Sequence, residues 1–580
     1  MADNGGRIVA DMLAAEGVGK VFGIPDGTYL ALLNALVARE ITVVTPRHET
    51  TAIHMAGAYA RLTGKLGVAI ASNGPGVANA LPGITVENAE GNRVLVITSS
   101  RRVGITYPDR GGTYQYFDQV AAIKPISKWS ATVPSVDRLP ELLRTALRWC
   151  YKGRPGVVHL DIPESIVNGK TRAAVVIAPQ RTRRTEELVP DPALVDQAAT
   201  MLANADMPII HAGGGAIHAR AHDSLQAVAE RLHAPVTTSW SGRGAMTETS
   251  ELVWPITAIE PNNEVRNAGD VVLILGSRVG ETDWWGKPPN WRNADQQKVI
   301  HVDIDEESIG RNKPVDLAVV GDIGVFLDEL NKRLQASGME PPAARRAEVR
   351  RLIDIRKKDA DKRSKSLEDK AAPMVTAHVP VVCQEVFSDD AIVIADGGNT
   401  AVWANFFHQI RVPNTMLATP HFGMLGAGVG QALGAAEAFP DRQVYAIIGD
   451  GAFGMHPQEI ETAVRNGNKV VYLVISDRQW GMVKMTQSVA KAPLKMMIRK
   501  SLEPSATVNS DLGEIGYDQL ARSMGAHGER VSDPGELREA IERSLESGRC
   551  AVIHIDVDPV KHMWAPGLLQ FKKLHQEPAG

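Results

Sequence analysis

Short apolar segments of strand length recur along the whole chain and alternate with segments of helical spacing. Examples are VFGIP, VLVITSS and GVVHLDIP in the first third, and QVYAIIGDG, KVVYLVISD and CAVIHIDVD in the last third. Strands that alternate with helices predict βαβ units, in which helices cover both faces of a parallel sheet. The sequence therefore predicts an α/β protein built from mostly parallel, doubly wound sheets.

The chain is too long for a single hydrophobic core, because cores stop growing at roughly 250–300 residues and this chain has 580. A polar, proline-bearing stretch at 166–192 and a charge-dense stretch at 336–372 predict two connections. The second connection is expected to be an exposed helix. The predicted units are 1–170, 190–335 and 375–560, followed by a tail at 561–580 whose apolar and aromatic residues predict packing on the body.

The charge balance excludes several classes of partner. A formal net charge of −4 gives no overall attraction to nucleic acid or to an anionic membrane. The longest apolar runs, such as VVLIL at 271–275, are far shorter than the roughly 18 residues of a membrane span, and the first residues lack the pattern of a secretory signal. We therefore expect a cytoplasmic protein that acts on small molecules, with neither nucleic acid nor membrane as partner.

Two acidic residues follow neighbouring strands of the third unit. Asp450 follows the strand YAII between Gly449 and Gly451, and Asp477 follows the next strand. Open α/β sheets bind ligands at the carboxyl ends of their strands, and oxygen ligands suit Mg2+. Glycine lets the backbone approach a phosphate closely. Either aspartate alone could simply cap a helix, but the whole segment predicts a site for Mg2+ and a phosphorylated ligand.

This segment resembles the cofactor-binding motif of thiamine diphosphate enzymes, in which Gly-Asp-Gly is followed a little under thirty residues later by an Asn pair. Ser476 and Asp477 stand here in place of Asn-Asn. The resemblance implies that Asp450, Asp477 and the carbonyl of Gln479 hold Mg2+. An aspartate at 477 keeps the oxygen ligand and adds negative charge, which should tighten Mg2+ and repel the diphosphate. The residues implied to line the cofactor in this segment are Gly449, Asp450, Gly451 and Ala452.

A second match lies in TPRHETTAIHMAGAYARLTGKLGVAIASNGPG, near the amino terminus. Glu49 alone would be an acid in the first turn of a helix. Enzymes that resemble acetolactate synthase carry the same Arg-His-Glu, followed by a Gly-Pro-Gly turn that corresponds to Gly74, Pro75 and Gly76. The resemblance implies that Gly74 and Pro75 contact the cofactor. The resemblance implies that Glu49 is catalytic and hydrogen-bonds N1′ of the cofactor's aminopyrimidine, so that the proton on C2 can leave.

Further residues are assigned by the same resemblance. Leu425, in the glycine-rich segment FGMLGAGVGQALGAA, is implied to support the bent cofactor, and Gly398 and Asn399 are implied to contact its diphosphate. Close helix packing would equally explain that glycine-rich segment. On the substrate side the implied residues are Gln115, to hydrogen-bond reacting oxygens, Lys128, to attract a carboxylate, and Trp480 and Met482 after the metal motif.

Two departures from the family leave the substrate open. Thr486 stands where the biosynthetic acetolactate synthases have Trp, and the stretch up to Lys500 is basic, so it could bind the diphosphate of coenzyme A or simply face solvent. In the second unit, the turn HAGGGAIHARA could hold FAD or ADP, although a tight strand-to-helix turn explains it equally well.

The resemblance spans residues 7 to about 560 and implies a pyrimidine-binding domain (1–170), a middle domain (190–335) and a diphosphate-binding domain (375–560). The expected function is acetolactate synthase-like bond formation or decarboxylation on a 2-keto acid. The alternatives are a 2-hydroxyacyl-CoA lyase or oxalyl-CoA decarboxylase, a non-catalytic member of the fold, and an NAD-dependent dehydrogenase, although no Gly-x-Gly-x-x-Gly follows an early strand. Because Glu49 and Asp450 lie in different domains, and the family usually pairs them across subunits, we expect a homodimer or homotetramer.

Overall fold

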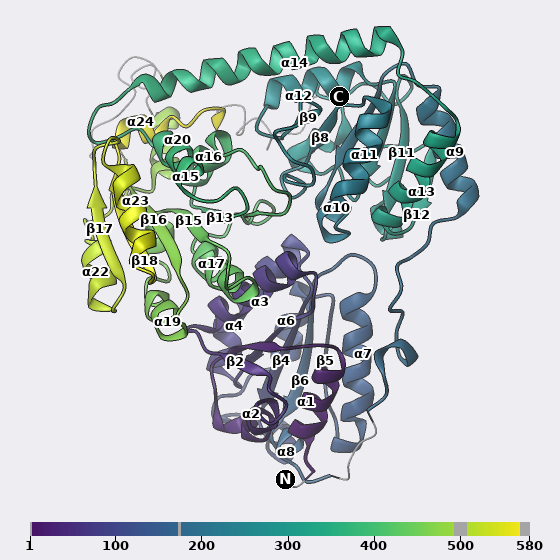
Figure 1. Cartoon of the computed structure of the whole chain (residues 1–580). Helices are drawn as coiled ribbons and strands as arrows, with labels where there is room; N and C mark the ends of the chain where they lie inside the picture. The colour runs from purple at the N-terminus through teal and green to yellow at the C-terminus, as the bar shows by residue number, and fades with distance from the viewer. Residues whose placement is uncertain (1–2, 172–175, 492, 494–506, 569–580) are drawn as a thin grey trace.

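The computed structural model of the chain describes residues 3–171, 176–491, 493 and 507–568. It contains three α/β domains, with the first at the bottom of Figure 1 and the other two side by side above it. Each domain is built on a six-stranded sheet whose strand pairs are parallel. The structure therefore confirms the predicted fold class.

The first domain holds the first six strands of the chain. Its sheet has the order β2-β1-β3-β4-β6-β5. The strands are β1 (Lys20–Gly23), β2 (Thr42–Val44), β3 (Gly67–Ala71), β4 (Val94–Ser100), β5 (Trp129–Thr132) and β6 (Val157–Pro163). The principal helices are α1 (Gly5–Ala15), α2 (Leu30–Val37), α3 (Glu49–Thr63), α4 (Pro75–Glu90) and α7 (Leu139–Tyr151).

The third domain repeats this strand order, as β14-β13-β15-β16-β18-β17. Its strands are β13 (Ile392–Asp396), β14 (Met416–Leu417), β15 (Val444–Gly449), β16 (Val470–Ser476), β17 (His527–Val531) and β18 (Ala551–Asp556). The helices are α15 (His378–Val386), α16 (Asn399–Phe407), α17 (Ala427–Ala438), α18 (Asp450–Phe453), α19 (Glu459–Asn466), α20 (Gly481–Lys491), α22 (Tyr517–Ser523), α23 (Leu537–Glu546) and α24 (Pro559–Met563).

The middle domain is wound differently, with the order β12-β11-β10-β7-β8-β9. The chain reverses direction across the sheet between β7 and β10, the arrangement of a doubly wound sheet with one switch point. The strands are β7 (Pro208–Ala212), β8 (Val236–Thr238), β9 (Val253–Trp254), β10 (Val271–Leu275), β11 (Lys298–Asp303) and β12 (Leu317–Val320). The helices are α9 (Pro192–Ala203), α10 (Gly214–His218), α11 (His222–Leu232), α12 (Ile259–Ala268) and α13 (Ile323–Ala336).

A long helix, α14 (Ala343–Ser364), crosses the top of the molecule from the middle domain to the third domain (Figure 1). Val349 and Leu352 are buried in the core of the middle domain. Near the other end, Arg363 donates to the carbonyl of Thr257 and lies over the ring of Phe406. The helix is therefore fastened to the middle domain along its first half and reaches the third domain with its last turn.

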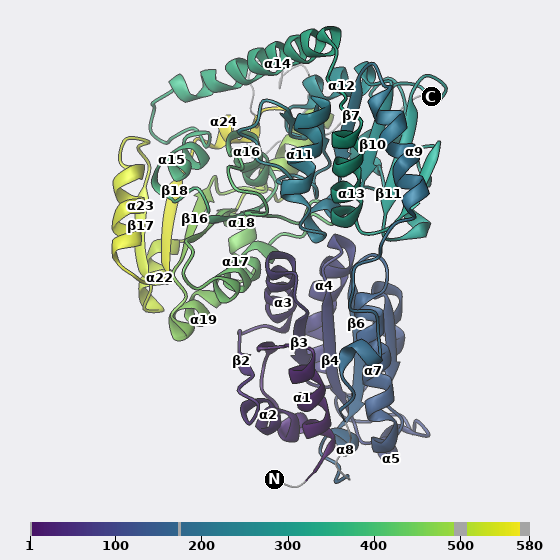
Figure 2. The same cartoon turned by 45° about the vertical axis from the view of Figure 1, so that its right-hand side comes forward.

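The first and third domains share one hydrophobic core through α3 and α17, which lie side by side in Figures 1 and 2. The two helices approach closely because glycines face the partner helix. A Cβ on Gly434 would lie 2.4 Å from the carbonyl oxygen of Met55, and one on Gly430 would lie 2.9 Å from Cβ of His54. The glycine-rich segment that begins near Leu425 is thus accounted for in part by packing.

The chain that follows β18 packs on the third domain. Met563, Ala565 and Leu568 are buried against Val402 and Trp403, and Trp403 Nε1 donates to the carbonyl of His562 at 2.9 Å. Residues 569–580 of the expected tail lie outside the described residues. Among those that are described, no helix combines the length and the apolar character needed to cross a bilayer.

Candidate active site

Asp450 joins the ends of two neighbouring strands of the third domain. It is the first residue of α18, directly after β15, and its Oδ1 accepts the N–H of Gly451 at 2.7 Å. Its Oδ2 accepts the hydroxyl of Ser476, the last residue of β16, at 3.3 Å, and the N–H of Arg478, in the turn that follows, at 2.8 Å. The carboxylate therefore ties the turn after β15 to the turn after β16.

Beside Asp450 are buried polar atoms that no group of the described residues satisfies. Asp477 is 7% exposed and Asn399 is 4% exposed. Among the residues that the structure describes, Asp477 Oδ2 and both amide atoms of Asn399 have no hydrogen-bond partner. A Cβ on Gly481 would lie 2.8 Å from Asp477 Oδ2 and 2.9 Å from Asn399 Nδ2, so these groups meet in one small space. Buried polar groups are normally satisfied, so such atoms indicate a place for a ligand.

The electrostatics of this space favour a cation. Burial, followed by the charge of Asp477, raises the pKa of Asp450 to about 6, and burial raises the pKa of Asp477 to about 7. His562 supplies no positive charge, because burial lowers its pKa to about 4. Its ring is held by Thr376, and Nε2 lies 3.9 Å from Asp477 Oδ2. Two carboxylates in this setting fit a divalent metal ion such as Mg2+.

The remaining metal ligands would have to be other than His, Cys, Asp or Glu side chains of the described residues. Among the residues that the structure describes, no group of three or more His, Cys, Asp or Glu is placed to hold a metal. Gln479 follows Asp477 directly in the turn, and its side chain is engaged with the carbonyl of Pro559 at 2.8 Å. Backbone carbonyl oxygens and phosphate oxygens are suitable further ligands for a Mg2+ ion held by two carboxylates.

Glycines form the wall beside the two aspartates. A Cβ on Gly451 would lie 2.6 Å from the ring of Trp480, and one on Gly449 would lie 3.0 Å from Thr400 Oγ1. A Cβ on Gly398 would lie 3.3 Å from Cβ of Met482. The structure thus brings most residues predicted for the diphosphate side into one cluster. Ala452, also predicted, is buried in the apolar core shared with the first domain.

Asp396 positions Leu425. Its Oδ2 accepts the backbone N–H groups of Gly426 and Gly428 at 2.9 and 2.8 Å, and its Oδ1 accepts the N–H of Gly397 at 2.6 Å. Burial raises the pKa of this carboxyl to about 6. The contacts fix the loop after β13 against the beginning of α17, so Leu425 is held at the edge of the cluster.

The predicted residues of the first domain form a separate group. Glu49 is the first residue of α3, is 8% exposed, and accepts a hydrogen bond from Asn79 Nδ2 at 3.1 Å. A Cβ on Gly76 would lie 3.2 Å from Glu49 Oε1. Gly74, with φ of 65°, packs against the backbone of Gln115, where a Cβ would lie 2.6 Å from the carbonyl oxygen. Pro75 begins α4 directly after this turn.

A cavity of about 380 Å³ lies where the three domains meet. Arg61 and Glu90 of the first domain and Trp240 and Arg243 of the middle domain line it. The third domain contributes Gly398, Leu425, Phe422 and Met482 to the lining. Neither Glu49 nor Asp450 is a lining residue of this cavity.

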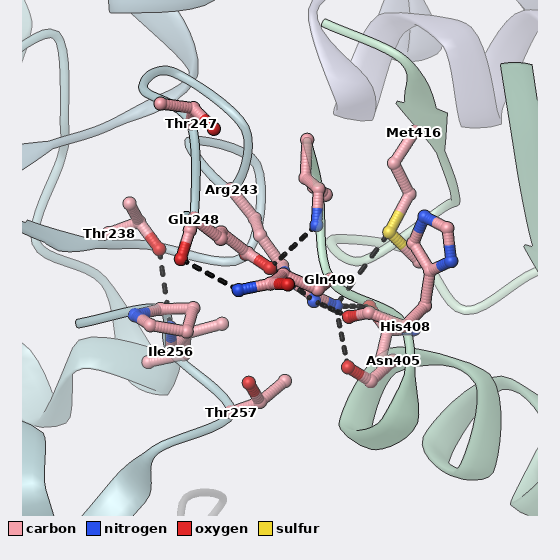
Figure 3. Close-up of polar contacts among 12 residues, drawn as sticks. Thr238, Arg243, Thr247, Glu248, Ile256, Thr257, Asn405, His408, Gln409 and Met416 are labelled. Atoms are coloured by element: carbon pink, nitrogen blue, oxygen red, sulfur yellow. Dashed lines mark hydrogen bonds and ion pairs between the residues drawn. The ribbon is translucent and has the colours of Figure 1, made fainter. Parts of the chain in front are cut away.

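A buried arginine joins the middle domain to the third domain beside the cavity (Figure 3). Arg243 pairs with Glu248, with Nε and Oε1 2.7 Å apart. It also donates to the carbonyl and side-chain oxygens of Asn405, at 2.7 and 2.9 Å, and to the carbonyl of His408. Glu248 in turn accepts the N–H of Ile410 at 2.9 Å. The pair therefore fixes the part of the middle domain that lines the cavity relative to the third domain.

Lys128, predicted to attract a substrate carboxylate, contacts the protein backbone. Its Nζ donates to the carbonyls of Trp149 and Lys152, at 2.9 and 2.5 Å, at the end of α7. Burial lowers its pKa to about 8. The ammonium group is thus used to satisfy the carbonyls of a helix end.

The glycine turn of the middle domain is accounted for by packing. A Cβ on Gly213 would lie 2.2 Å from the carbonyl oxygen of Gly276, and one on Gly215 would lie 2.7 Å from its Cα. The turns after β7 and β10 therefore touch backbone to backbone at the switch point of the sheet. The glycines are required there whether or not a nucleotide binds.

Some residues of the site were missed by the sequence analysis. Arg243 and Glu248 are ordinary charged residues five positions apart, and no motif marks them. His562 and Asn405 are equally unmarked. Asp396 did carry a signal, since it stands two residues before Gly398 and three before Asn399, which were assigned to the diphosphate.

Comparison with known families accounts for this architecture. The first domain matches the "Thiamine pyrophosphate enzyme, N-terminal TPP binding domain" over residues 3–122. The "central domain" of the same enzymes matches 195–330, and the "C-terminal TPP binding domain" matches 396–555. Three consecutive domains, two of which bind the cofactor in that family, define a thiamine pyrophosphate (thiamine diphosphate) enzyme. The chain belongs to the thiamine pyrophosphate enzyme family.

Relatives with assigned names cover nearly the whole chain. A "Probable acetolactate synthase large subunit" of Methanocaldococcus jannaschii is 27% identical over 574 residues, which is 96% of this chain and 92% of the relative. The "Acetolactate synthase isozyme 3 large subunit" of Escherichia coli is 27% identical, over 97% of this chain and 96% of the relative. A "2-hydroxyacyl-CoA lyase" of Oryza sativa subsp. japonica is also 27% identical, over 96% of both chains.

Proposed function

We propose that this protein makes or breaks a carbon–carbon bond next to the carbonyl of a 2-keto acid, using thiamine diphosphate and Mg2+. The observation that carries the proposal is the pair of buried aspartates, Asp450 and Asp477, beside unsatisfied amide atoms of Asn399 and a wall of glycines. The names of the acetolactate synthase relatives support the reaction class. The protein is proposed to act in the cytoplasm.

Asp450, Asp477 and the carbonyl of Gln479 would hold Mg2+, and Gly398, Asn399, Gly449 and Gly451 would contact the diphosphate. When bound, the cofactor supplies a nucleophilic carbon and accepts the electron pair released as the bond beside the carbonyl breaks. Leu425 would support the cofactor from below. Trp480 and Met482 flank the glycine wall and would limit the space for the substrate.

Glu49 would hold a proton at N1′ of the aminopyrimidine, as a carboxylic acid or carboxylate in a buried position can do. Gln115, packed against Gly74 in the same group, would orient the reacting oxygens of the substrate by hydrogen bonds. Because Glu49 lies outside the cavity that Leu425 and Met482 line, we propose that the complete site forms between two protomers. A homodimer is then the smallest active unit, and a homotetramer is compatible with it.

A second candidate, a 2-hydroxyacyl-CoA lyase or oxalyl-CoA decarboxylase, shares cofactor and metal. It is favoured by the rice relative, which is as similar to this chain as the acetolactate synthases are. The cavity of about 380 Å³ among the three domains also leaves room for a larger acyl group than the methyl of pyruvate. The two candidates differ in whether the substrate is a free acid or a thioester.

Two experiments test the proposal. Thiamine diphosphate with Mg2+ should change the near-ultraviolet circular dichroism of the protein on titration, and Asp450→Ala should abolish that change. Assays of one preparation with pyruvate, oxalyl-CoA and a 2-hydroxyacyl-CoA then separate the two candidates. The absence of cofactor binding by the unaltered protein would overturn both.

A further inference from the structure

We infer that this chain binds its divalent cation in the absence of any diphosphate, because Asp477 gives the metal site a second carboxylate. The inference rests on the proposed function, which places the metal between Asp450 and Asp477. It concerns the order of binding: the cation enters first, and the diphosphate then binds to a site that already contains metal.

The geometry places both carboxylates in one buried space. Asp450 and Asp477 directly follow β15 and β16, which pair in parallel register with Gly449 opposite Ile475. Both side chains are buried. Neutral donors satisfy Asp450. Asp477 Oδ1 accepts a long hydrogen bond of 3.4 Å from the N–H of Gln479, whereas Oδ2 accepts none from the described residues. Asp477 therefore keeps an oxygen free for a cation.

The basic groups around this space are engaged elsewhere. Lys484 pairs with Asp511 at 2.6 Å, and the guanidinium of Arg478 pairs with Glu514 at 3.3 Å. His562, whose Nε2 lies 3.9 Å from Asp477 Oδ2, is held by Thr376 and Thr400. Lys484 and Arg478 thus form their direct ion pairs with Asp511 and Glu514 rather than with the two buried aspartates, and a divalent cation has the charge that matches these aspartates.

An asparagine at position 477 would change the net charge of the metal site. The site would then carry one negative charge, and the second positive charge of the metal would be met by the diphosphate. With aspartate at position 477, the two carboxylates of the protein match the two positive charges of the metal ion. Affinity for a divalent cation rises with the number of charged ligands, and the effect is larger in a buried site, where charges are weakly screened. The gain for the metal alone is accompanied by a smaller attraction for the anionic diphosphate.

The test measures metal binding to protein freed of cofactor and metal. Mn2+ is titrated in, without diphosphate, and bound ion is followed by electron paramagnetic resonance and calorimetry. We expect one Mn2+ per chain in the unaltered protein. Asp477→Asn should weaken this binding at least about tenfold, while thiamine diphosphate still binds when Mg2+ is saturating. Mn2+ should compete with Mg2+ for the same site.

Two further variants support the interpretation. Glu251→Gln removes the same charge at the surface of the middle domain, where Glu251 pairs with Lys357, and should leave Mn2+ binding unchanged. Asp450→Asn should weaken Mn2+ binding as Asp477→Asn does, which provides a second measurement if either variant folds poorly by circular dichroism.

The outcomes are distinguishable. Equal Mn2+ affinity in the unaltered protein and in Asp477→Asn would overturn the inference, as would an unaltered protein that binds thiamine diphosphate with Mg2+ but does not bind Mn2+ alone. An unaltered protein that binds Mn2+ but never thiamine diphosphate would overturn the proposed function, and with it the order of binding.

Discussion

Arg243 and Glu248 form a two-point ion pair inside the protein, with Nε 2.7 Å from Oε1 and Nη2 3.0 Å from Oε2. Both side chains belong to the middle domain, yet the groups that satisfy their remaining atoms, on Asn405, His408 and Ile410, belong to the third domain. The pair therefore acts as a joint between two domains.

Removal of the arginine alone should be costly. Arg243→Met leaves Glu248 buried without its cation, and losing one partner of a buried pair typically costs about 3–5 kcal/mol. We expect a decrease of that size in the free energy of unfolding, measured by urea denaturation. Adding Glu248→Gln to Arg243→Met should recover part of the loss, because the unpaired charge is gone while the acceptor for Ile410 remains. A single variant as stable as the unaltered protein would contradict the role of the pair.

Glu49→Gln should separate chemistry from binding. The amide keeps the shape of the side chain but cannot exchange a proton with N1′, so kcat should fall by a factor on the order of 10²–10⁴. The affinity for thiamine diphosphate should change little, as measured by circular dichroism. Glu141→Gln, at an exposed position of α7 where Glu141 pairs with Arg138, serves as the control. Near-normal turnover in Glu49→Gln would remove this residue from the mechanism.

The free energy of unfolding should decrease as pH decreases, in part because of His159. Burial lowers its pKa to about 3 in the folded protein, against about 6.5 in an unfolded chain. Between these values the unfolded state binds a proton that the folded state does not, so stability is lost as pH falls below about 6.5. His159→Gln should reduce the slope of the unfolding free energy against pH by up to about 1.4 kcal/mol per pH unit. Urea denaturation at several pH values between 4 and 6 measures both slopes, and equal slopes would contradict the assignment.

The contact between α3 and α17 should not tolerate a methyl group. In Gly434→Ala the new Cβ would lie 2.4 Å from the carbonyl oxygen of Met55, and such overpacking costs about 1–3 kcal/mol. This exceeds the roughly 1 kcal/mol that alanine gains over glycine within a helix. Gly19→Ala, where a Cβ would have no atom of the described residues within 4 Å apart from its chain neighbours, should be neutral. Thermal unfolding of the two variants compares them directly, and a stabilised Gly434→Ala would show that the helices can move apart.

The sequence predicted the fold well because its signals are local. Alternation of strands and helices is visible in segments of a few residues, and the Gly-Asp-Gly of 449–451 is contiguous. The groups that complete the site come from distant segments: Asp396 reaches the start of α17, and His562 reaches Asp477 from beyond the last strand. Such contacts depend on how sheets and loops pack, which a pattern of residue types does not encode.

Lys128 illustrates the opposite case. Its position in a family-like segment suggested a substrate contact, whereas the side chain satisfies carbonyls at the end of α7. A long flexible side chain can turn toward either use, and only its surroundings decide between them.

The fastening of α14 at both ends fixes its helical phase. Each residue of an α-helix advances the chain by 1.5 Å and turns it by about 100°. An insertion of a single residue between Leu352, buried in the middle domain, and Arg363, over the ring of Phe406, would rotate the guanidinium away from its contacts. Changes in the length of this helix should therefore be tolerated mainly in whole turns. The 22 residues of α14 thus set the distance and the rotation between its contacts with the middle domain and with the third domain.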